Sequence, residues 1–91
     1  MAILLVSSAP SREMYDKVDH ITNLAADRPN GLLMHAAAEQ ADGTVSIVDV
    51  WESENAMRAF ERDRLFPAFA SAERPMDNSP TPLETFHLVK A

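Results

Sequence analysis

The sequence contains no cysteine, few basic residues and no long apolar run. Without cysteine, the chain can form neither disulfides nor zinc fingers, and thiol catalysis is excluded. Its 8 Lys and Arg residues against 14 Asp and Glu residues give a formal net charge of -6. The chain therefore lacks the basic surface by which proteins hold nucleic acid or an anionic membrane, and we expect neither as a partner.

The N-terminal stretch "MAILLVSSAP" has no basic residue before its apolar run, which covers only residues 2–6. Such a run is too short for a signal peptide or for a membrane span. The composition, 46% hydrophobic and 24% charged, is ordinary for a soluble globular protein. We therefore expect one cytoplasmic domain that covers residues 1–91.

The pattern of apolar residues and turn signals predicts the element order β-α-β-β-α-β. The strands are expected at 2–9, 32–40, 44–52 and 83–90, and the helices at 11–27 and 54–65. Pro67 is expected to interrupt the second helix and to leave 67–73 as a short helical piece, before a proline-rich loop at 74–82. This order predicts an α+β, ferredoxin-like fold with a four-stranded antiparallel sheet and both helices on one face.

The strongest turn signal, Asp42-Gly43, lies between the second and third strands. As a two-residue turn it places Ala36 opposite Asp49 and Met34 opposite Trp51. Alternation then predicts two faces: Met34, Ala36, Ala38, Ile47, Asp49 and Trp51 on one, and Leu33, His35, Ala37, Val48 and Val50 on the other. Both faces are mainly apolar, whereas two helices cover only one. We therefore expect the second face to meet another copy of the chain in a homodimer.

Residues 31–69, "GLLMHAAAEQADGTVSIVDVWESENAMRAFERDRLFPAF", resemble the central part of the dimeric α+β barrel superfamily, in its antibiotic-biosynthesis-monooxygenase-like branch. The resemblance rests on the Gly-apolar-apolar-x-His strand, the Asp-Gly hairpin, the "VDVWES" junction and the "DRLFPAF" helix end. It implies a homodimer with one apolar pocket per subunit, and a cofactor-independent, monooxygenase-like enzyme of secondary metabolism. The substrate implied is a bulky aromatic or polyketide-like molecule.

The cofactor-free anthrone oxidases of this branch carry an Asn four residues before the pocket Trp and a Tyr six residues after it. Only Trp51 matches that pattern here, because the other two positions are Ile47 and Met57. Neither of these side chains can donate a hydrogen bond to a quinone-like oxygen. The resemblance therefore implies the pocket more strongly than the anthrone-oxidase mechanism.

Three residues are candidates for catalysis. Burial of Asp49 within an apolar strand would disfavour its charged form and raise its pKa, and a raised pKa suits a general base. The alternative is a carboxylate that only orders the end of the strand. His35 could act as an acid or base, or be a hydrogen-bonded interface residue. Arg64, near the apolar stripe of the second helix, could hold an enolate oxygen or lie on the surface.

The candidates for substrate binding are apolar or amphipathic side chains that can line an adaptable pocket. They are Trp51, Met34, Met57, Phe60, Phe66, Phe69 and Tyr15. Trp51 is expected to stack on the substrate, and Tyr15 to reach the pocket or its rim. The alternative for the whole set is an ordinary core.

No metal site and no cofactor are expected, because the three histidines are scattered and lack the spacing of metal ligands. Two other functions remain open. One is an aldol-type polyketide cyclase that uses the same base and pocket, and the other is a non-catalytic ligand-binding or interaction protein. A second polar group opposite Asp49 would distinguish an enzyme from a simple binding protein.

Overall fold

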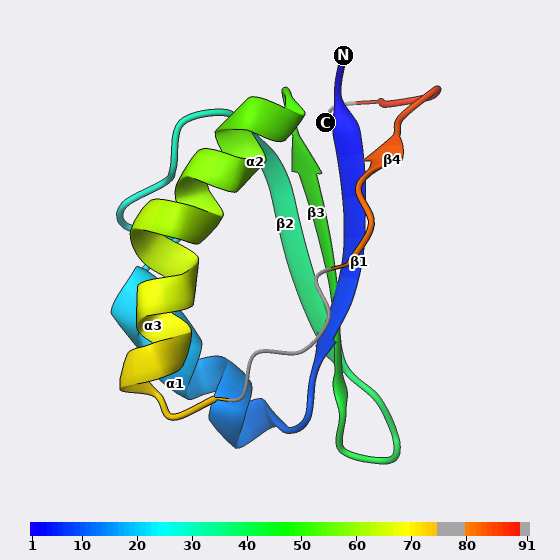
Figure 1. Ribbon diagram of the computed structural model, residues 1–91. Helices are drawn as coiled ribbons and strands as arrows, with labels where there is room; N and C mark the ends of the chain where they lie inside the picture. Colours follow the sequence, from blue (N-terminus) through cyan, green and yellow to red (C-terminus); the bar gives the residue numbers. More distant parts are fainter. Residues whose placement is uncertain (75–79, 90–91) are drawn as a thin grey trace.

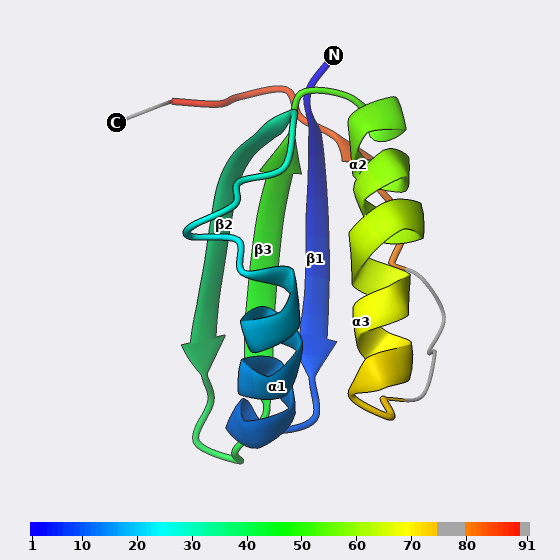
Figure 2. The same cartoon turned by 90° about the vertical axis from the view of Figure 1, so that its left-hand side faces the viewer.

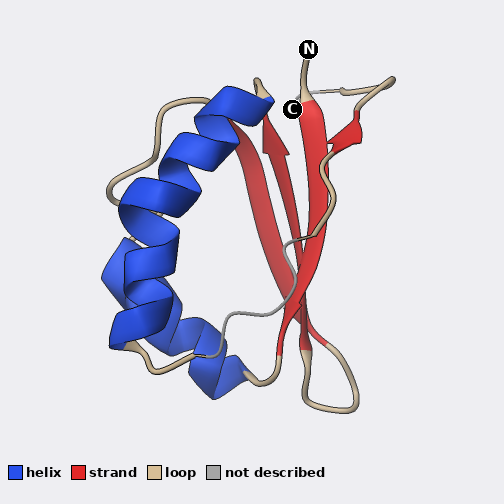
Figure 3. Cartoon of the chain, viewed as in Figure 1, coloured by secondary structure: helices blue, strands red, loops and turns tan. Residues whose placement is uncertain are grey.

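The structure, a computed structural model, describes residues 1–74 and 80–89 and consists of two layers (Figure 1). The strands form one layer and the helices form the other (Figure 3). In Figure 2, with the helical layer toward the viewer, the first helix lies in front of the middle of the sheet and the second helical segment lies alongside it. The elements are β1 (Ile3–Ala9), α1 (Arg12–Thr22), β2 (Leu32–Glu39), β3 (Val45–Trp51), α2 (Glu54–Phe60), the π-helical turn η1 (Glu61–Leu65), α3 (Phe66–Ser71) and β4 (Leu83–Glu84).

The sheet has the strand order β2-β3-β1-β4, and the three pairings between neighbouring strands are antiparallel. This is the order that a ferredoxin-like βαββαβ chain produces, so the predicted fold class is confirmed. No helix in the described part of the chain is long and apolar enough to cross a membrane.

Two predicted boundaries were wrong. The first helix ends at Thr22 rather than at 27, because Asn23 adopts the left-handed conformation (φ 53°) that terminates helices. The last strand covers only Leu83–Glu84, because Glu84 already pairs with Ile3, the first residue of β1. Residues 75–79 of the predicted loop and residue 90 of the predicted strand lie outside the described residues.

The second helix does not stop before Pro67, which was expected to interrupt it. It widens into η1, in which the Phe66 N–H donates to the Glu61 carbonyl five residues earlier, and then continues as α3. In a regular α-helix the ring of Pro67 would collide with the carbonyl of Asp63. The wider turn relieves this conflict, so α2, η1 and α3 form one continuous rod (Figure 1).

The hairpin between β2 and β3 has a three-residue loop rather than the predicted two-residue turn. The Gly43 N–H donates to the Gln40 carbonyl, the Gln40 N–H donates to the Thr44 carbonyl, and Gly43 has φ +89°. This is the geometry of a type I turn followed by a left-handed glycine. The predicted register was therefore wrong by one residue, and such a slip moves every side chain of a strand to the other face.

The observed register places His35 opposite Asp49, Met34 opposite Val50 and Ala36 opposite Val48. Met34 and Ala36 thus face away from the helices, whereas His35 shares the helix-facing side with Asp49 and Trp51. An irregularity between Leu32 and Met34 also turns Leu32 toward the helices, opposite Trp51. The outer face of the three long strands consists of uncharged residues: Leu4, Val6, Ser8, Met34, Ala36, Ala38, Ser46, Val48 and Val50.

Gly31, just before β2, is expected to tolerate no side chain. It has φ +85°, and a Cβ atom there would lie 2.6 Å from the Cβ of Ala56. We expect Gly31→Ala to lower the free energy of unfolding by at least about 1–3 kcal/mol from backbone strain, with the steric clash added to it. Gly43→Ala is the matched control, because Gly43 has a similar φ of +89° but nothing within 4 Å. Urea unfolding of both variants measures the difference, and equal losses would refute a close approach at Gly31.

Candidate functional site

A cavity of about 340 Å³ lies between the sheet and the helices. Its size falls in the range of small-molecule sites. Much of its wall is apolar, and the residues involved include Leu5, Val18, Ile47, Phe60, Phe66 and Phe69. The ionisable side chains that line it are Tyr15, Asp19, His35, Asp49, Glu61 and Arg74. An apolar cavity with a few polar groups is the usual form of a ligand site.

Three of these polar side chains form a hydrogen-bonded network. His35 Nδ1 lies 2.5 Å from Asp49 Oδ1, and the Tyr15 hydroxyl lies 2.7 Å from His35 Nε2. A carboxylate can only accept, so His35 Nδ1 carries the proton in this arrangement and Nε2 accepts from the Tyr15 hydroxyl. The order Asp49–His35–Tyr15 is that of a triad in which a carboxylate orients a histidine toward a hydroxyl.

The elements that carry the network explain its geometry. Asp49 and His35 are cross-strand neighbours on the helix-facing side of the sheet. Ser11 caps α1 by accepting a hydrogen bond from the Met14 N–H, and Tyr15 follows within the first turns, where it packs against the cluster around Val45. Both partners of His35 therefore belong to regular secondary structure, which holds them in place.

The surroundings of the network also shift two pKa values. The hydrogen bond that His35 donates to Asp49 raises the pKa of His35, against the opposing effect of burial. Burial raises the pKa of Tyr15, and the nearby carboxylates of Asp19 and Asp49 add to this effect. His35 thus holds a proton more firmly than an ordinary histidine, whereas Tyr15 remains a neutral hydroxyl over a wider pH range.

Sequence reasoning identified each member of this network but not their contact, because the predicted register placed His35 and Asp49 on opposite faces. The three-residue hairpin loop corrects this. Asp49 is hydrogen-bonded to the imidazole of His35. Proton exchange with a molecule in the cavity would therefore pass through His35 and Tyr15 rather than through Asp49 itself. The participation of these residues in catalysis stays a prediction.

Glu61 is a cavity residue that sequence reasoning missed. It is only 4% exposed and lines the cavity beside Phe60. Its carboxylate accepts a hydrogen bond from Arg58 at 3.0 Å. The signal was present in the sequence, because Glu61 lies four residues after the buried Met57 and so on the same helical face.

Arg64 lies elsewhere than predicted. Its guanidinium donates to the carbonyls of Thr22 and Asp27 and lies 5.4 Å from the centroid of the Phe60 ring, and it does not line the cavity. The prediction assumed α-helical spacing, in which a residue three or four positions after Phe60 and Glu61 shares their face. In the π turn, residues five positions apart share a face. Leu65 and Phe66 therefore line the cavity, and Arg64 caps the end of α1 instead.

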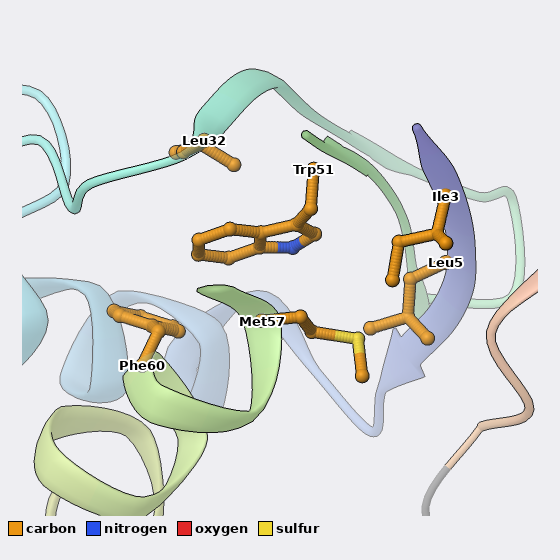
Figure 4. Close-up of a cluster of buried hydrophobic side chains, with 6 residues drawn as sticks. All are labelled: Ile3, Leu5, Leu32, Trp51, Met57 and Phe60. Carbon is orange, nitrogen blue, oxygen red and sulfur yellow. The ribbon is translucent and has the colours of Figure 1, made fainter. Parts of the chain in front are cut away.

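The predicted substrate-binding residues divide into three groups. Tyr15, Phe60, Phe66 and Phe69 line the cavity. Trp51 and Met57 are each 1% exposed and belong to the core (Figure 4). The Trp51 ring packs against Phe60, with ring centroids 5.3 Å apart. Met34 is 44% exposed on the outer face of the sheet. The structure therefore places Trp51 behind the cavity wall and Met34 on the wrong side of the sheet for substrate contact.

In residues 1–74 and 80–89, no group of three or more His, Asp or Glu side chains is arranged to hold a metal ion. The two positions that replace the Asn and Tyr of the anthrone oxidases differ in their surroundings. Ile47 lines the cavity and Met57 lies in the core. The polar groups of this cavity thus come from other positions: Tyr15 on α1, His35 and Asp49 on the sheet, and Glu61 on η1.

No protein-family model matches the chain, and no curated protein sequence matches it. Three solved structures do. A proposed antibiotic biosynthesis monooxygenase from Deinococcus radiodurans aligns over 100% of this chain and 98% of its own, with a TM-score of 0.68 and 19% identity. A second proposed antibiotic biosynthesis monooxygenase, from Chloroflexus aurantiacus J-10-fl, aligns over 100% of this chain and 97% of its own. Its TM-score is 0.64 and its sequence identity is 18%.

A conserved protein from Methanosarcina mazei Go1 covers 90% of this chain and 88% of its own, with a TM-score of 0.56 and 15% identity. At these identities the likeness concerns the fold. The chain therefore shares the ferredoxin-like α+β fold of the structures described as antibiotic biosynthesis monooxygenases, as the resemblance in residues 31–69 implied.

Proposed function

We propose that this chain is a small cofactor-independent enzyme that removes a proton from a bulky, apolar aromatic substrate of polyketide-like type. The observation that carries the proposal is the Tyr15–His35–Asp49 network in the wall of an apolar cavity. A histidine that is oriented by a carboxylate and linked to a hydroxyl is equipped for proton transfer. The fold shared with proposed antibiotic biosynthesis monooxygenases supports a monooxygenase-like reaction.

The proton follows the hydrogen bonds. The Tyr15 hydroxyl donates to His35 Nε2, so its oxygen is free to accept a proton from the substrate while its own proton passes to Nε2. One proton leaves the substrate and one arrives on His35, whose charge Asp49 then stabilises at 2.5 Å. The electron pair left on the substrate carbon is the reactive group. In the monooxygenase-like version, this carbanion adds to molecular oxygen, and the proton held by His35 completes a hydroperoxide on that carbon. The O–O bond then breaks, and the outer oxygen leaves as water with the remaining hydrogen of the carbon, which becomes a carbonyl.

Two alternatives use the same cavity. In an aldol-type cyclase the carbanion attacks a carbonyl carbon within the same molecule, and no oxygen is consumed. In a non-catalytic ligand-binding protein the network only orients a bound aromatic molecule. The observation that favours this last alternative is that the Tyr15 hydroxyl already occupies the His35 Nε2 position, which shields the histidine from direct contact with a ligand.

Anthrone, an aromatic ketone with acidic methylene protons, is a suitable probe of the proposal. We expect the protein to accelerate exchange of these protons for deuterium in D₂O, followed by NMR. Because the pKa of His35 is raised and the neutral imidazole is the base, the rate should rise with pH, and its midpoint should lie above the usual histidine value of about 6.5. Tyr15→Phe should reduce the rate and leave anthrone affinity similar.

The same experiment separates the three functions when oxygen consumption is recorded. Exchange together with oxygen uptake indicates the monooxygenase-like reaction, and exchange alone indicates a proton-transfer enzyme such as a cyclase. Binding of anthrone without exchange indicates a ligand-binding protein. An exchange rate equal to that of heat-denatured protein at every pH from 6 to 8.5 would contradict the enzymatic proposal.

We also propose that the chain forms a homodimer through the outer face of the sheet. This face carries no charged residue on β1, β2 or β3, and its Val6 and Met34 side chains are 54% and 44% exposed. Sheet-to-sheet pairing of two copies buries this surface by the simplest closed symmetry. Sedimentation at micromolar concentration should therefore give twice the monomer mass.

Val48→Asp tests this interface, because Val48 pairs with Val6 on one side and Ala36 on the other. A buried unpaired charge at this position should convert the dimer to monomer or unfold it. The control is Ala41→Asp in the exposed hairpin loop, which should remain dimeric. A folded wild-type monomer at all concentrations would exclude the proposed interface.

A further inference from the structure

Among the described residues, Glu61 is a buried ionisable group that the proposed proton transfer does not use. Its side chain is 6% exposed, yet it forms part of the cavity wall. We propose that Glu61 anchors a hydrogen-bond donor of the ligand. The site would then take aromatic molecules with a hydroxyl or amino group at each end and disfavour aromatic carboxylates. This inference rests on the proposed function only in placing an aromatic ligand in the cavity.

The ion pair with Arg58 compensates the carboxylate of Glu61 inside the protein. A buried carboxylate is costly unless a partner compensates it, and Arg58 Nη1 donates to Glu61 Oε1 at 3.0 Å. The Arg58 side chain is 46% exposed and does not line the cavity. The carboxylate can accept further hydrogen bonds, since its two oxygens offer about four acceptor sites, and the donor of the proposed ligand would occupy one of them.

The position of Glu61 determines the shape of ligand that can use it. Glu61 belongs to the helical wall, whereas His35 and Asp49 belong to the sheet wall. The π turn places Glu61 and Phe66 on the same face. A ligand that contacts both the Tyr15 hydroxyl and Glu61 therefore needs an apolar ring system between two polar ends. Glu61 is also a polar group of the cavity that the sequence did not reveal.

The charge around the cavity favours donors over anions. Its lining contains three carboxylates, those of Asp19, Asp49 and Glu61, against the guanidinium of Arg74. Arg74 itself donates to the Ser8 carbonyl at 2.8 Å and lies over the Phe69 ring. A ligand carboxylate beside Glu61 would meet like charge in a site of reduced polarity, which is unfavourable. A phenol or an amine would instead donate to Glu61.

Isothermal titration with three naphthalene probes tests the inference: 2,6-dihydroxynaphthalene, 6-hydroxy-2-naphthoate and 2-naphthol. We expect wild-type protein to bind the diol at least about tenfold more tightly than the naphthoate, since hydrogen bonds to charged groups carry this much discrimination. In Glu61→Gln the difference should fall below about threefold, because an amide both donates and accepts. Binding of 2-naphthol, which has one polar end, should change little.

Glu54→Gln is the matched control. Glu54 is the other carboxylate near Arg58, at 3.7 Å, but it is 57% exposed and does not line the cavity. This variant carries the same change of charge on the same helical rod and should retain the wild-type preference for the diol. Loss of the preference in both variants would overturn the assignment to Glu61, because overall charge would then explain the selectivity.

The remaining outcomes separate this inference from the proposed function. Equal affinity of the wild-type protein for the diol and the naphthoate overturns the role of Glu61 and leaves the proposed proton transfer intact. This comparison uses wild-type protein only, so it remains decisive if Glu61→Gln does not fold. The expected selectivity without any anthrone exchange overturns the proposed reaction alone. If none of the three probes binds wild-type protein at 1 mM, the cavity is not an aromatic site and both proposals fail.

Discussion

Asp49→Asn should lower the rate of anthrone proton exchange by about 10²–10⁴, the usual contribution of general acid–base catalysis. The carboxylate accepts the Nδ1 proton of His35 at 2.5 Å and so keeps Nε2 available to accept from Tyr15. The amide of Asn can donate to Nδ1 instead. That favours the tautomer with its proton on Nε2, in which the histidine can no longer receive a proton from Tyr15.

The change should act on turnover rather than on binding, because Asn has nearly the same shape as Asp. NMR exchange rates at saturating anthrone, compared with rates at low anthrone, separate the two effects. The control is Asp63→Asn, an exposed aspartate that pairs with Arg62 on the helical rod, and it should behave as wild type. If the exchange rate per folded Asp49→Asn molecule is close to that of the wild type, Asp49 only orders the end of its strand and takes no part in proton transfer.

Trp51→Ala should lower the free energy of unfolding by about 3–5 kcal/mol, the cost of truncating a large core side chain. Trp51 is 1% exposed and packs among Ile3, Leu5, Leu32, Met57 and Phe60 (Figure 4). Its removal leaves a cavity between the sheet and α2. Its indole Nε1 has no hydrogen-bond partner among the described residues, so no polar interaction is lost with the ring.

Urea unfolding followed by circular dichroism measures this loss without relying on the fluorescence of the only tryptophan. Ile21→Ala is the control, because Ile21 is also apolar but is 46% exposed on α1, away from the sheet face proposed for the dimer, and its truncation should lower the free energy of unfolding far less. Affinity for 2-naphthol per folded Trp51→Ala molecule should change modestly, since Trp51 does not line the cavity itself and lies behind the lining residues Leu5 and Phe60. If Trp51→Ala keeps a nearly normal free energy of unfolding but no longer binds 2-naphthol, Trp51 contacts the ligand directly and this assignment to the core is wrong.

The periodicity of the sequence determined the architecture of this protein. The pattern of apolar residues predicted three of the strands at nearly their observed positions. Ser11 and Ser53, which cap α1 and α2, lie where the two helices were predicted to begin. Such features depend on residues close together in the chain, so local physical chemistry is enough to predict them. The apolar character of both sheet faces is likewise a property of composition and alternation.

Tertiary structure alone decided which of these residues meet. A single extra residue in the hairpin loop changed the partner of Asp49 from Ala36 to His35, and sequence separation gives no sign of that slip. The π turn before Pro67 turned Arg64 toward the end of α1 and brought Leu65 and Phe66 into the cavity wall.

Both changes are displacements of one residue within correctly predicted elements. They are invisible to a pattern of apolar positions, because that pattern tolerates one inserted residue at a turn or in a helix. They control the site, however, because hydrogen bonds such as those of His35 extend less than 3 Å. A shift of one residue along a strand moves a side chain about 3.3 Å and to the opposite face. The fold therefore follows from the sequence pattern, whereas the network of Tyr15, His35 and Asp49 exists only in the folded chain.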